Sequence, residues 1–389
     1  MPSRLHRVLL WVHRWVGLTV GLVFTVVSVS GSLILFQPQY FQWAHGDLLP
    51  EELSGHVSSI DRWVENGRRA VPHLQGPIAI WAPHVEHNVS PAGMLVFGGQ
   101  QPGGLGNMGF AGVLVAPDSG DVLGVIDIDR SPAYAPLFLH RDLWAGTTGQ
   151  VVSGIVAVGT LILLVIGLYL WWPASMRLGR KLWPRDWRKT FTHARPLHDW
   201  VGVWTFGLLA VLTGTGLYLV RPAWVSPVLD VAAGPETAAI DHPDACGLPI
   251  GFDEAMTRAA SLVARGEWKA VYPGDTAQRW EITFATHGRN AMHDETHVIA
   301  DLQCGIVTVD ATPQNRSTRE AAEMWLIGVH DGSAFGPIGI AVVTLAGFLP
   351  IVLTWSGFRL WLRRRAIRPV QAEGRGRLRQ RVASDPLSS

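Results

Sequence analysis

The stretch HRWVGLTVGLVFTVVSVSGSLILF, residues 13–36, is an apolar segment that a histidine opens, and it decides the fold because it recurs. His198 opens HDWVGVWTFGLLAVLTGTGLYLV, with Trp, Val and Gly at the same offsets as after His13. A further glycine follows each of these histidines by 18 residues, Gly31 in the first copy and Gly216 in the second.

A second pair of segments repeats in the same way. His140 and His330 are each followed by glycines at +6, +9 and +27 and by a tryptophan at +31. These residues are Gly146, Gly149, Gly167 and Trp171 in one copy, and Gly336, Gly339, Gly357 and Trp361 in the other. Four histidines therefore mark four apolar segments, and the segments form two duplicated pairs.

The composition indicates a membrane protein. Of the 389 residues 48% are hydrophobic and only 16% are charged, against roughly 25% charged residues in soluble domains. About 20 apolar residues cross a hydrocarbon core of about 30 Å, so we expect transmembrane helices within 15–36, 150–172, 200–220 and 337–362. The first segment is longer than the roughly 7–15 apolar residues of a secretory signal and no small-residue cleavage site follows it, which favours a retained span.

Lysine and arginine residues mark the span ends that we expect in the cytoplasm. They are Arg4, Arg7 and Arg14; Arg177, Arg180, Lys181, Arg185, Arg188, Lys189 and Arg195; and Arg359 and Arg363 to Arg365. The two long loops, 37–139 and 221–329, contain 10 acidic against 4 basic and 15 acidic against 8 basic residues. Both loops are therefore expected outside, and both termini inside.

Each outer loop contains one helical pattern followed by strand-like runs between turn residues. The predicted helices are 58–70 and 252–264, and the predicted strands are 78–82, 94–97, 112–116 and 122–128 in the first loop, and WKAVYP, RWEITFATH, HVIADL and GIVTVD in the second. Cys246 and Cys304 both lie in the second loop, where an oxidising compartment permits a disulfide that two cysteines alone do not prove.

The predicted fold is a membrane α-helical bundle of four transmembrane helices in two duplicated pairs, with two periplasmic α+β domains. Its parts are the cytoplasmic start and first span, 1–36; the first outer domain, 37–136; a His-bearing segment and the second span, 137–172; a basic connector, 173–197; the third span, 198–220; the second outer domain, 221–326; a His-bearing segment and the fourth span, 327–362; and a basic cytoplasmic tail, 363–389, expected to be disordered.

The expected topology pairs the four histidines by depth. His13 and His198 open outward-running spans and belong at the cytoplasmic end, whereas His140 and His330 precede inward-running spans and belong at the outer end. Two histidines at one depth on different helices can supply both axial ligands of a haem. Small residues nearby leave room for such a group: Gly17, Gly21, Gly202 and Gly207.

The glycines after His140 and His330 predict a helix break before the second and fourth spans. A straight helix would hold His140 well above the hydrocarbon core, since 31 residues of helix from Trp171 extend about 46 Å. We expect the break to fold each histidine back toward the bundle.

Other interpretations stay open for these residues. A single histidine near a membrane interface is commonly a hydrated polar residue, and duplication copies a structural histidine as readily as a ligand. His6 and His193 are rival ligands at the cytoplasmic end. Four loop histidines have metal-ligand spacing in contexts that favour the surface: His84, His87, His293 and His297. The tract GGQQPGGLGNMG, 98–109, fits a dinucleotide-binding spacing, but no helix follows and we expect a flexible loop.

The motifs HRWVGLTVGL (13–22), LHRDLWAGTTGQ (139–150), LHDWVGVW (197–204), GLYLWWP (167–173) and VHDGSAFGPIG (329–339) resemble the PepSY-associated transmembrane family, in particular its FoxB-type siderophore reductases. The outer loops resemble divergent PepSY domains. The resemblance implies a bacterial inner-membrane oxidoreductase that passes electrons outward through two haem b groups to Fe(III) in an imported siderophore. Carried over, the haem ligands are His13 with His198 and His140 with His330.

The expected partners follow from this resemblance and from the topology. They are a ferric siderophore, the lipid bilayer and, because no cytoplasmic segment holds a flavin or nicotinamide domain, a quinol or a separate reductase as electron donor. No nucleic acid is expected. Two alternatives remain: a permease for siderophores or other small molecules, which the repeats suggest, and a PepSY-type sensory or regulatory protein. Spans without charged midplane residues argue against the permease, and a sensory role leaves the duplicated histidines unexplained.

Overall fold

The computed structural model describes residues 3–51, 56–85, 88–98, 109–172, 182–183, 186–234, 246–263, 265–274, 276, 278–285 and 295–365. The four predicted spans are confirmed as helices long and apolar enough to cross a membrane: α1 (Arg4–Ile34), α5 (Gly146–Trp171), α8 (Ala194–Val220) and the fourth span, Ser333–Arg365. Most of the basic connector, 173–181 and 184–185, and the tail from 366 lie outside the described residues, as does most of the glycine-rich tract, 99–108.

The chain divides into two compact units. The helical unit comprises Met1–Ser28, Val156–Thr213 and Ala346–Ser389, and the sheet unit comprises Val29–Ile155 and Gly214–Leu345. Each of the four long helices contributes one part to each unit. The shorter helices are α2 (Gln37–His45), η1 (Gly46–Leu48), α3 (Ile60–Ala70), α4 (Ala135–Asp142), α7 (Trp187–Thr192), α9 (Pro222–Ala233), α10 (Phe252–Leu262), α11 (Thr318–Asp331), η3 (Ser333–Phe335) and α12 (Gly336–Ala346).

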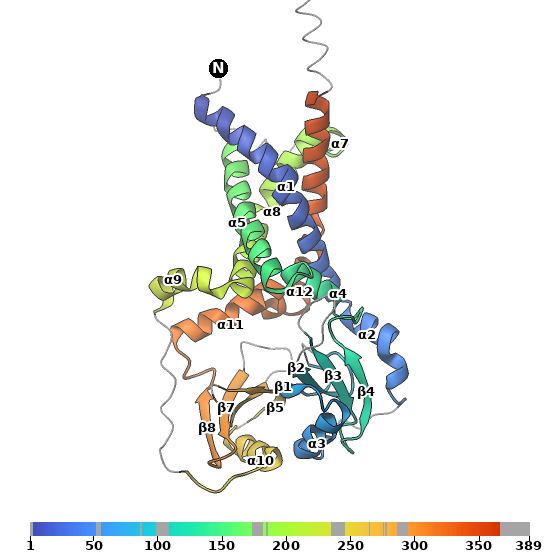
Figure 1. Cartoon of the computed structure of the whole chain (residues 1–389). Coiled ribbons are helices and arrows are strands. Elements are labelled where there is room, and N and C mark those ends of the chain that lie inside the picture. The colour runs from blue at the N-terminus through green and yellow to red at the C-terminus, as the bar shows by residue number, and fades with distance from the viewer. Residues whose placement is uncertain are drawn as a thin grey trace, which may run out of the picture. The chain divides into compact units, whose positions relative to one another are not determined.

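The strands predicted in the two loops are confirmed, and they form a single antiparallel sheet of eight strands (Figure 1). They are β1 (Gln75–Trp81), β2 (Gly93–Gly98), β3 (Ala111–Val115), β4 (Val122–Asp127), β5 (Glu267–Pro273), β6 (Arg279–Ala285), β7 (Glu295–Asp301) and β8 (Ile306–Ala311). Their order is β4-β3-β2-β1-β5-β6-β7-β8. The structure thus joins the two predicted outer domains into one sheet, because β1 pairs with β5 through Ile80 opposite Val271 and Trp81 opposite Ala270.

Residues that alternate along the strands face two different cores. On one face the helices α3 and α10 cover the sheet (Figure 1), and Trp63 of α3 and Phe252 of α10 share a core with Leu95 of β2. Met94, which directly precedes Leu95 in β2, belongs to the core of the opposite face, together with Phe138 of α4. The side-chain period of two in a strand therefore explains why β2 is apolar at nearly every position.

The two loop helices cap each other at their N-termini. The Asp61 carboxylate of α3 accepts hydrogen bonds from the backbone N–H groups of Phe252 (2.8 Å) and Asp253 (3.0 Å) at the start of α10. Asp253 in turn accepts from the N–H groups of Ile60 (2.6 Å) and Asp61 (3.3 Å) and from the Ser59 hydroxyl (2.6 Å). Carboxylates satisfy the unpaired donors at helix N-termini and favour the positive end of the dipole, so this exchange ties the two duplicated halves together.

The disulfide that the sequence permits is present. Cys246 and Cys304 are bonded, with an S–S distance of 1.93 Å. The N–H of Gly247 also donates to the carbonyl of Cys304 at 2.8 Å. Together these bonds hold the segment that leads into α10 against the turn between β7 and β8.

A polar cluster on β5, β6 and β7 predicts an acid-sensitive contribution to stability. Lys269 pairs with Glu295, and Nδ1 of His297 bonds the Glu281 carboxylate. That hydrogen bond lowers the pKa of the Glu281 carboxyl, and burial opposes it only in part. Because the pKa is lowered in the folded chain, the stabilisation is fully present above the ordinary value of 4.5 and is lost as the pH falls through the folded value.

We therefore expect the unfolding midpoint of the purified protein to fall more steeply below pH 4.5 than that of Glu281→Gln. Thermal unfolding followed by tryptophan fluorescence at a series of pH values measures this. Glu254→Gln is the matched control, because Glu254 lies in an exposed pair with Arg258. Superimposable pH profiles for the unmodified protein and Glu281→Gln would contradict the assignment.

Candidate functional site

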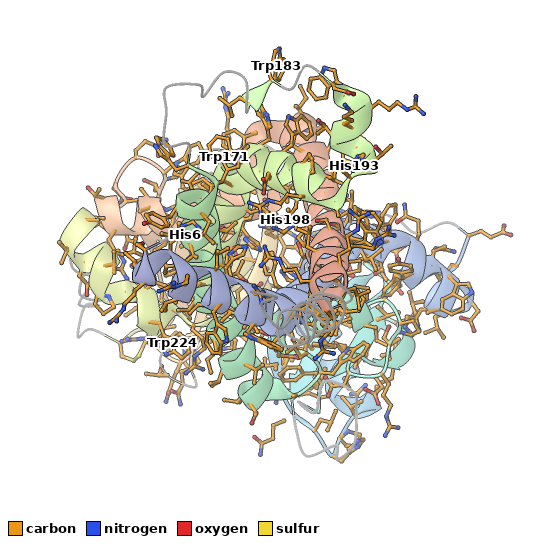
Figure 2. The ribbon with its side chains drawn as sticks, turned by 90° about the horizontal axis from the view of Figure 1, so that it is seen from above. His6, Trp171, Trp183, His193, His198 and Trp224 are labelled. Atoms are coloured by element: carbon orange, nitrogen blue, oxygen red, sulfur yellow. A yellow bond between two sulfur atoms is a disulfide. The ribbon has the colours of Figure 1, made fainter. Side chains whose placement is uncertain are left out.

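The first histidine pair lies in the helical unit. His13 stands inside α1 and His198 inside α8, since both helices begin several residues before the apolar spans that the sequence predicts. Their ring centroids are 6.2 Å apart and the rings are nearly perpendicular, at 86°. Figure 2 shows His198 in the interior of the helical unit, whereas Trp183 lies at its rim. The fold thus brings the side chains of His13 and His198 close together.

The two rings of this pair have different hydrogen bonds. Nδ1 of His198 lies 3.1 Å from the carbonyl oxygen of Leu353 and 2.9 Å from the hydroxyl of Ser356, both in the fourth span. A carbonyl only accepts, so Nδ1 of His198 carries the proton and Nε2 keeps its lone pair. Nδ1 of His13 is buried and has no hydrogen-bond partner among the residues that the structure describes.

A cavity of about 230 Å³ separates the helices around this pair, and both histidines line it. Its wall is largely apolar and contains several leucine and phenylalanine side chains. Gly17, Gly21 and Gly202 contribute to the wall as expected, whereas Gly207 does not. Both tryptophans of the +31 repeat, Trp171 and Trp361, are also part of the wall. Three arginines line the same cavity: Arg14, Arg195 and Arg364.

The second histidine pair lies in the sheet unit. His140 belongs to the short helix α4 and His330 to the end of α11, and their ring centroids are 5.9 Å apart with an angle of 42° between the rings. Nδ1 of His330 lies 3.0 Å from the hydroxyl of Thr215 in α8. Neither histidine stands on the long helix that follows it in the sequence.

The predicted helix breaks are confirmed, and the repeated glycines at +6 and +9 explain them. Gly146 and Gly336 have positive φ angles of 54° and 64°, which glycine adopts without strain. A Cβ at Gly149 would overlap the carbonyl of Asp142, and one at Gly339 the carbonyl of Gly332. The break begins earlier than the glycine-rich stretch in the first copy, because Leu143 and Trp144 already have positive φ.

The spacing of both pairs suits one metal ion between two imidazoles. Rings on opposite sides of a metal have centroids roughly 6.3 Å apart, since each bond is about 2.0 Å long and each nitrogen lies about 1.15 Å from its ring centroid. The separations of 6.2 and 5.9 Å fit this value. No group of three or more His, Cys, Asp or Glu side chains within the described ranges is placed to hold a bare metal ion. A metal that brings its own equatorial ligands needs only the two imidazoles.

The rival histidines lie outside these pairs. Neither His6 nor His193 lines the cavity, and His193 is exposed with its Nδ1 close to the carbonyl of Lys189, at 3.1 Å. Of the loop histidines, His297 is engaged with Glu281, while His87 and His293 lie outside the described residues. The hypothesis that the loop histidines bind metal therefore receives no support from the described part of the chain.

Sequence reasoning missed several residues of the candidate site. In the sequence, Arg14, Arg195 and Arg364 served only to predict which span ends lie in the cytoplasm, although all three line the cavity. The hydroxyls of Thr215 and Ser356, which contact histidines, were not predicted as site residues. The signal for the hydroxyls was available, because each directly precedes a glycine of the repeat, Gly216 or Gly357. The signal for the arginines was their position within one helical turn of the histidines or of Trp361.

No curated protein matches this chain. A family model described as a PepSY-associated TM region matches residues 10–364. The match includes all four histidines and reaches from the first span through the fourth.

Proposed function

This chain belongs to the PepSY-associated TM region family, and we propose that it is a membrane electron-transfer protein that carries two haem b groups and reduces Fe(III)-siderophore. His13 with His198 would hold one haem, and His140 with His330 the other. The observation that carries the proposal is that four histidines from distant parts of the sequence face each other as two pairs at metal-ligand spacing.

The lining of the cavity beside His13 and His198 supports a haem. Its wall is mainly apolar, as the porphyrin faces require, and it includes Arg14, Arg195 and Arg364. One of these charges is offset by the Arg195–Asp199 ion pair at 2.8 Å. Haem b carries two propionate carboxylates, and arginine is the side chain best suited to bind them. Three arginines and one aspartate therefore leave the two positive charges that two propionates need.

The chain's own residues have distinct roles in this site. His198 is held as an Nε2 ligand, because Leu353 and Ser356 bond its Nδ1. The leucines of the wall exclude water, and the arginines orient the group by its acidic edge. A haem held by His13 and His198 would supply one-electron transfer rather than oxygen activation.

We place the arginine-rich span ends in the cytoplasm and the sheet unit in the periplasm of a bacterial inner membrane. The lysine and arginine bias supports this orientation, and the Cys246–Cys304 disulfide supports an oxidising compartment for the sheet unit. A quinol or a separate reductase would supply the electrons. A quinol is oxidised to the quinone, its two electrons reduce two Fe(III) to Fe(II), and its two protons are released. Oxygen donors bind Fe(II) less tightly than Fe(III).

The test is a reduced-minus-oxidised absorbance spectrum of the purified full chain. We expect a b-type signal and about two haems per chain by extraction and haem assay. A ferric trihydroxamate or triscatecholate added to the pre-reduced protein should reoxidise it and release Fe(II) to a chelator.

The redox-inert Ga(III) complexes of the same chelators are the matched controls. A protein without a haem signal would refute the proposal and favour the permease or the sensory alternative. A protein with two haems that neither ferric complex reoxidises would refute the substrate and keep the electron-transfer role.

A further inference from the structure

Each candidate ligand rests on a glycine of a neighbouring segment, in a crossed arrangement. In the first half, a Cβ added at Gly31 of α1 would lie 2.7 Å from Cε1 of His140, and one at Gly167 of α5 would lie 3.1 Å from Cε1 of His13. The segment that carries one histidine thus provides the glycine for the other. These are the +18 and +27 glycines of the repeated sequence.

The second half repeats the arrangement. A Cβ added at Gly216 of α8 would lie 2.8 Å from Cε1 of His330, and one at Gly357 of the fourth span would lie 3.7 Å from Cε1 of His198. Real Cβ contacts below 3.0 Å are essentially never seen, whereas 3.7 Å is an ordinary contact. The glycine is therefore required most strictly at Gly31 and Gly216 and least at Gly357.

Three of the four glycines directly follow a residue with a hydroxyl side chain. Ser356 precedes Gly357 and its hydroxyl lies 2.9 Å from Nδ1 of His198, and Thr215 precedes Gly216 and lies 3.0 Å from Nδ1 of His330. Ser30 precedes Gly31. Only Gly167 follows an apolar residue, Ile166. It faces His13, whose Nδ1 makes no hydrogen bond to the described residues.

We propose that three of these glycines, Gly31, Gly167 and Gly216, are positioning residues for the haem ligands, as are the hydroxyls of Ser356 and Thr215. This inference rests on the proposed function. At these three glycines the missing Cβ lets the imidazole approach the helix backbone, which sets the distance between the two rings of a pair. The Ser356 hydroxyl donates its own proton to the carbonyl of Val352 at 2.6 Å, so it accepts from Nδ1–H of His198 and raises the basicity of Nε2. His13, which has Ile166 in place of the hydroxyl, is the weaker donor of its pair.

The crossed arrangement makes the test specific. Gly31 shares a helix with His13 but touches His140, so Gly31→Ala should remove the His140–His330 haem, about half of the absorbance. Adding His140→Ala should remove no more, and adding His13→Ala should remove the remainder. Gly216→Ala should behave as Gly31→Ala does.

Gly214→Ala is the matched control for Gly216→Ala, because it lies on the same helix and a Cβ there meets no described atom within 4 Å. Size-exclusion elution of every variant checks folding. If Gly216→Ala keeps both haems, as Gly214→Ala is expected to, the glycine role is overturned. Loss of the His13–His198 haem in Gly31→Ala would overturn it equally.

The role of the hydroxyl can be tested by the haem midpoint potential, which a nonspecific loss of folding would not shift in a defined direction. In a His140→Ala background, which keeps only the His13–His198 haem, Ser356→Ala should shift the midpoint potential to more positive values. Ser356→Thr should restore it, and Ile166→Ser should shift it to more negative values. Potentials that do not move in these directions overturn the hydroxyl role.

The two proposals fail in different ways. An unmodified protein without any haem signal ends both. An unmodified protein with two haems, whose glycine and serine variants behave as the controls do, ends only the positioning role.

Discussion

Replacing His13 with alanine is expected to remove about half of the reduced-minus-oxidised haem absorbance, because His13 would hold one of the two proposed haems. His198→Ala is expected to remove the same half, since the two rings face each other at 6.2 Å. The double variant His13→Ala/His198→Ala should therefore lose no more of the haem absorbance than either single variant. His13→Ala with His140→Ala should lose the whole signal.

This set of variants tests the pairing as well as the ligands. The quantity measured is the absorbance per chain of protein that elutes as a single species, with haem extraction as a second count. His193→Ala is the control, because this residue stands five positions before His198 yet is exposed and outside the cavity. If His13→Ala with His198→Ala abolished the signal completely, these two residues would belong to different haems and the pairing would be wrong.

Replacing Asp61 and Asp253 together with alanine is expected to lower the free energy of unfolding of the sheet unit by about 2–4 kcal/mol, at about 1–2 kcal/mol for each lost cap. Each change leaves backbone donors at one helix N-terminus without their carboxylate, and Asp253→Ala also frees the Ser59 hydroxyl. Because each aspartate serves the helix of the other repeat, Asp61→Ala should loosen the first turn of α10 rather than that of its own helix.

Hydrogen exchange measured by mass spectrometry resolves this directly. Amides at the start of α10 should exchange faster in Asp61→Ala, and amides at the start of α3 faster in Asp253→Ala. Glu254→Ala is the matched control, since this neighbouring acidic residue makes an exposed ion pair worth at most about 0.5 kcal/mol. Faster exchange confined to α3 in Asp61→Ala would contradict reciprocal capping.

The local elements of this chain were predictable because their causes are local. Four segments long enough to cross a membrane and eight short β-rich runs between turn residues correspond to the helices and strands of the structure. The break before α5 and α12 was also readable, since glycine marks the positions with positive φ, such as Gly146 and Gly336. The assignment of haem to the histidines remains a prediction.

The joining of the two loops was not predictable from either loop. β1 and β5 are both outer strands of their own four-stranded meander, with strong strand patterns and one unpaired edge each. Alternation along a strand reports which side chains are buried, but it carries no information about which other edge fills the backbone hydrogen bonds. Two separate domains and one shared sheet therefore have the same sequence pattern.

The four spans, the strand-bearing loops and the duplication can be read from the sequence, and the duplication includes the histidines and the glycines at +18 and +27. The recurrence of those glycines at matching positions also indicated that they have a shared role, although it did not show which side chains they contact. Those contacts are visible in the tertiary structure alone, where Gly31 lies against His140 and Gly167 lies against His13. The reason is physical, since helical period and hydropathy describe one helix at a time, while the clearance that a glycine provides depends on the ring that a neighbouring segment places beside it.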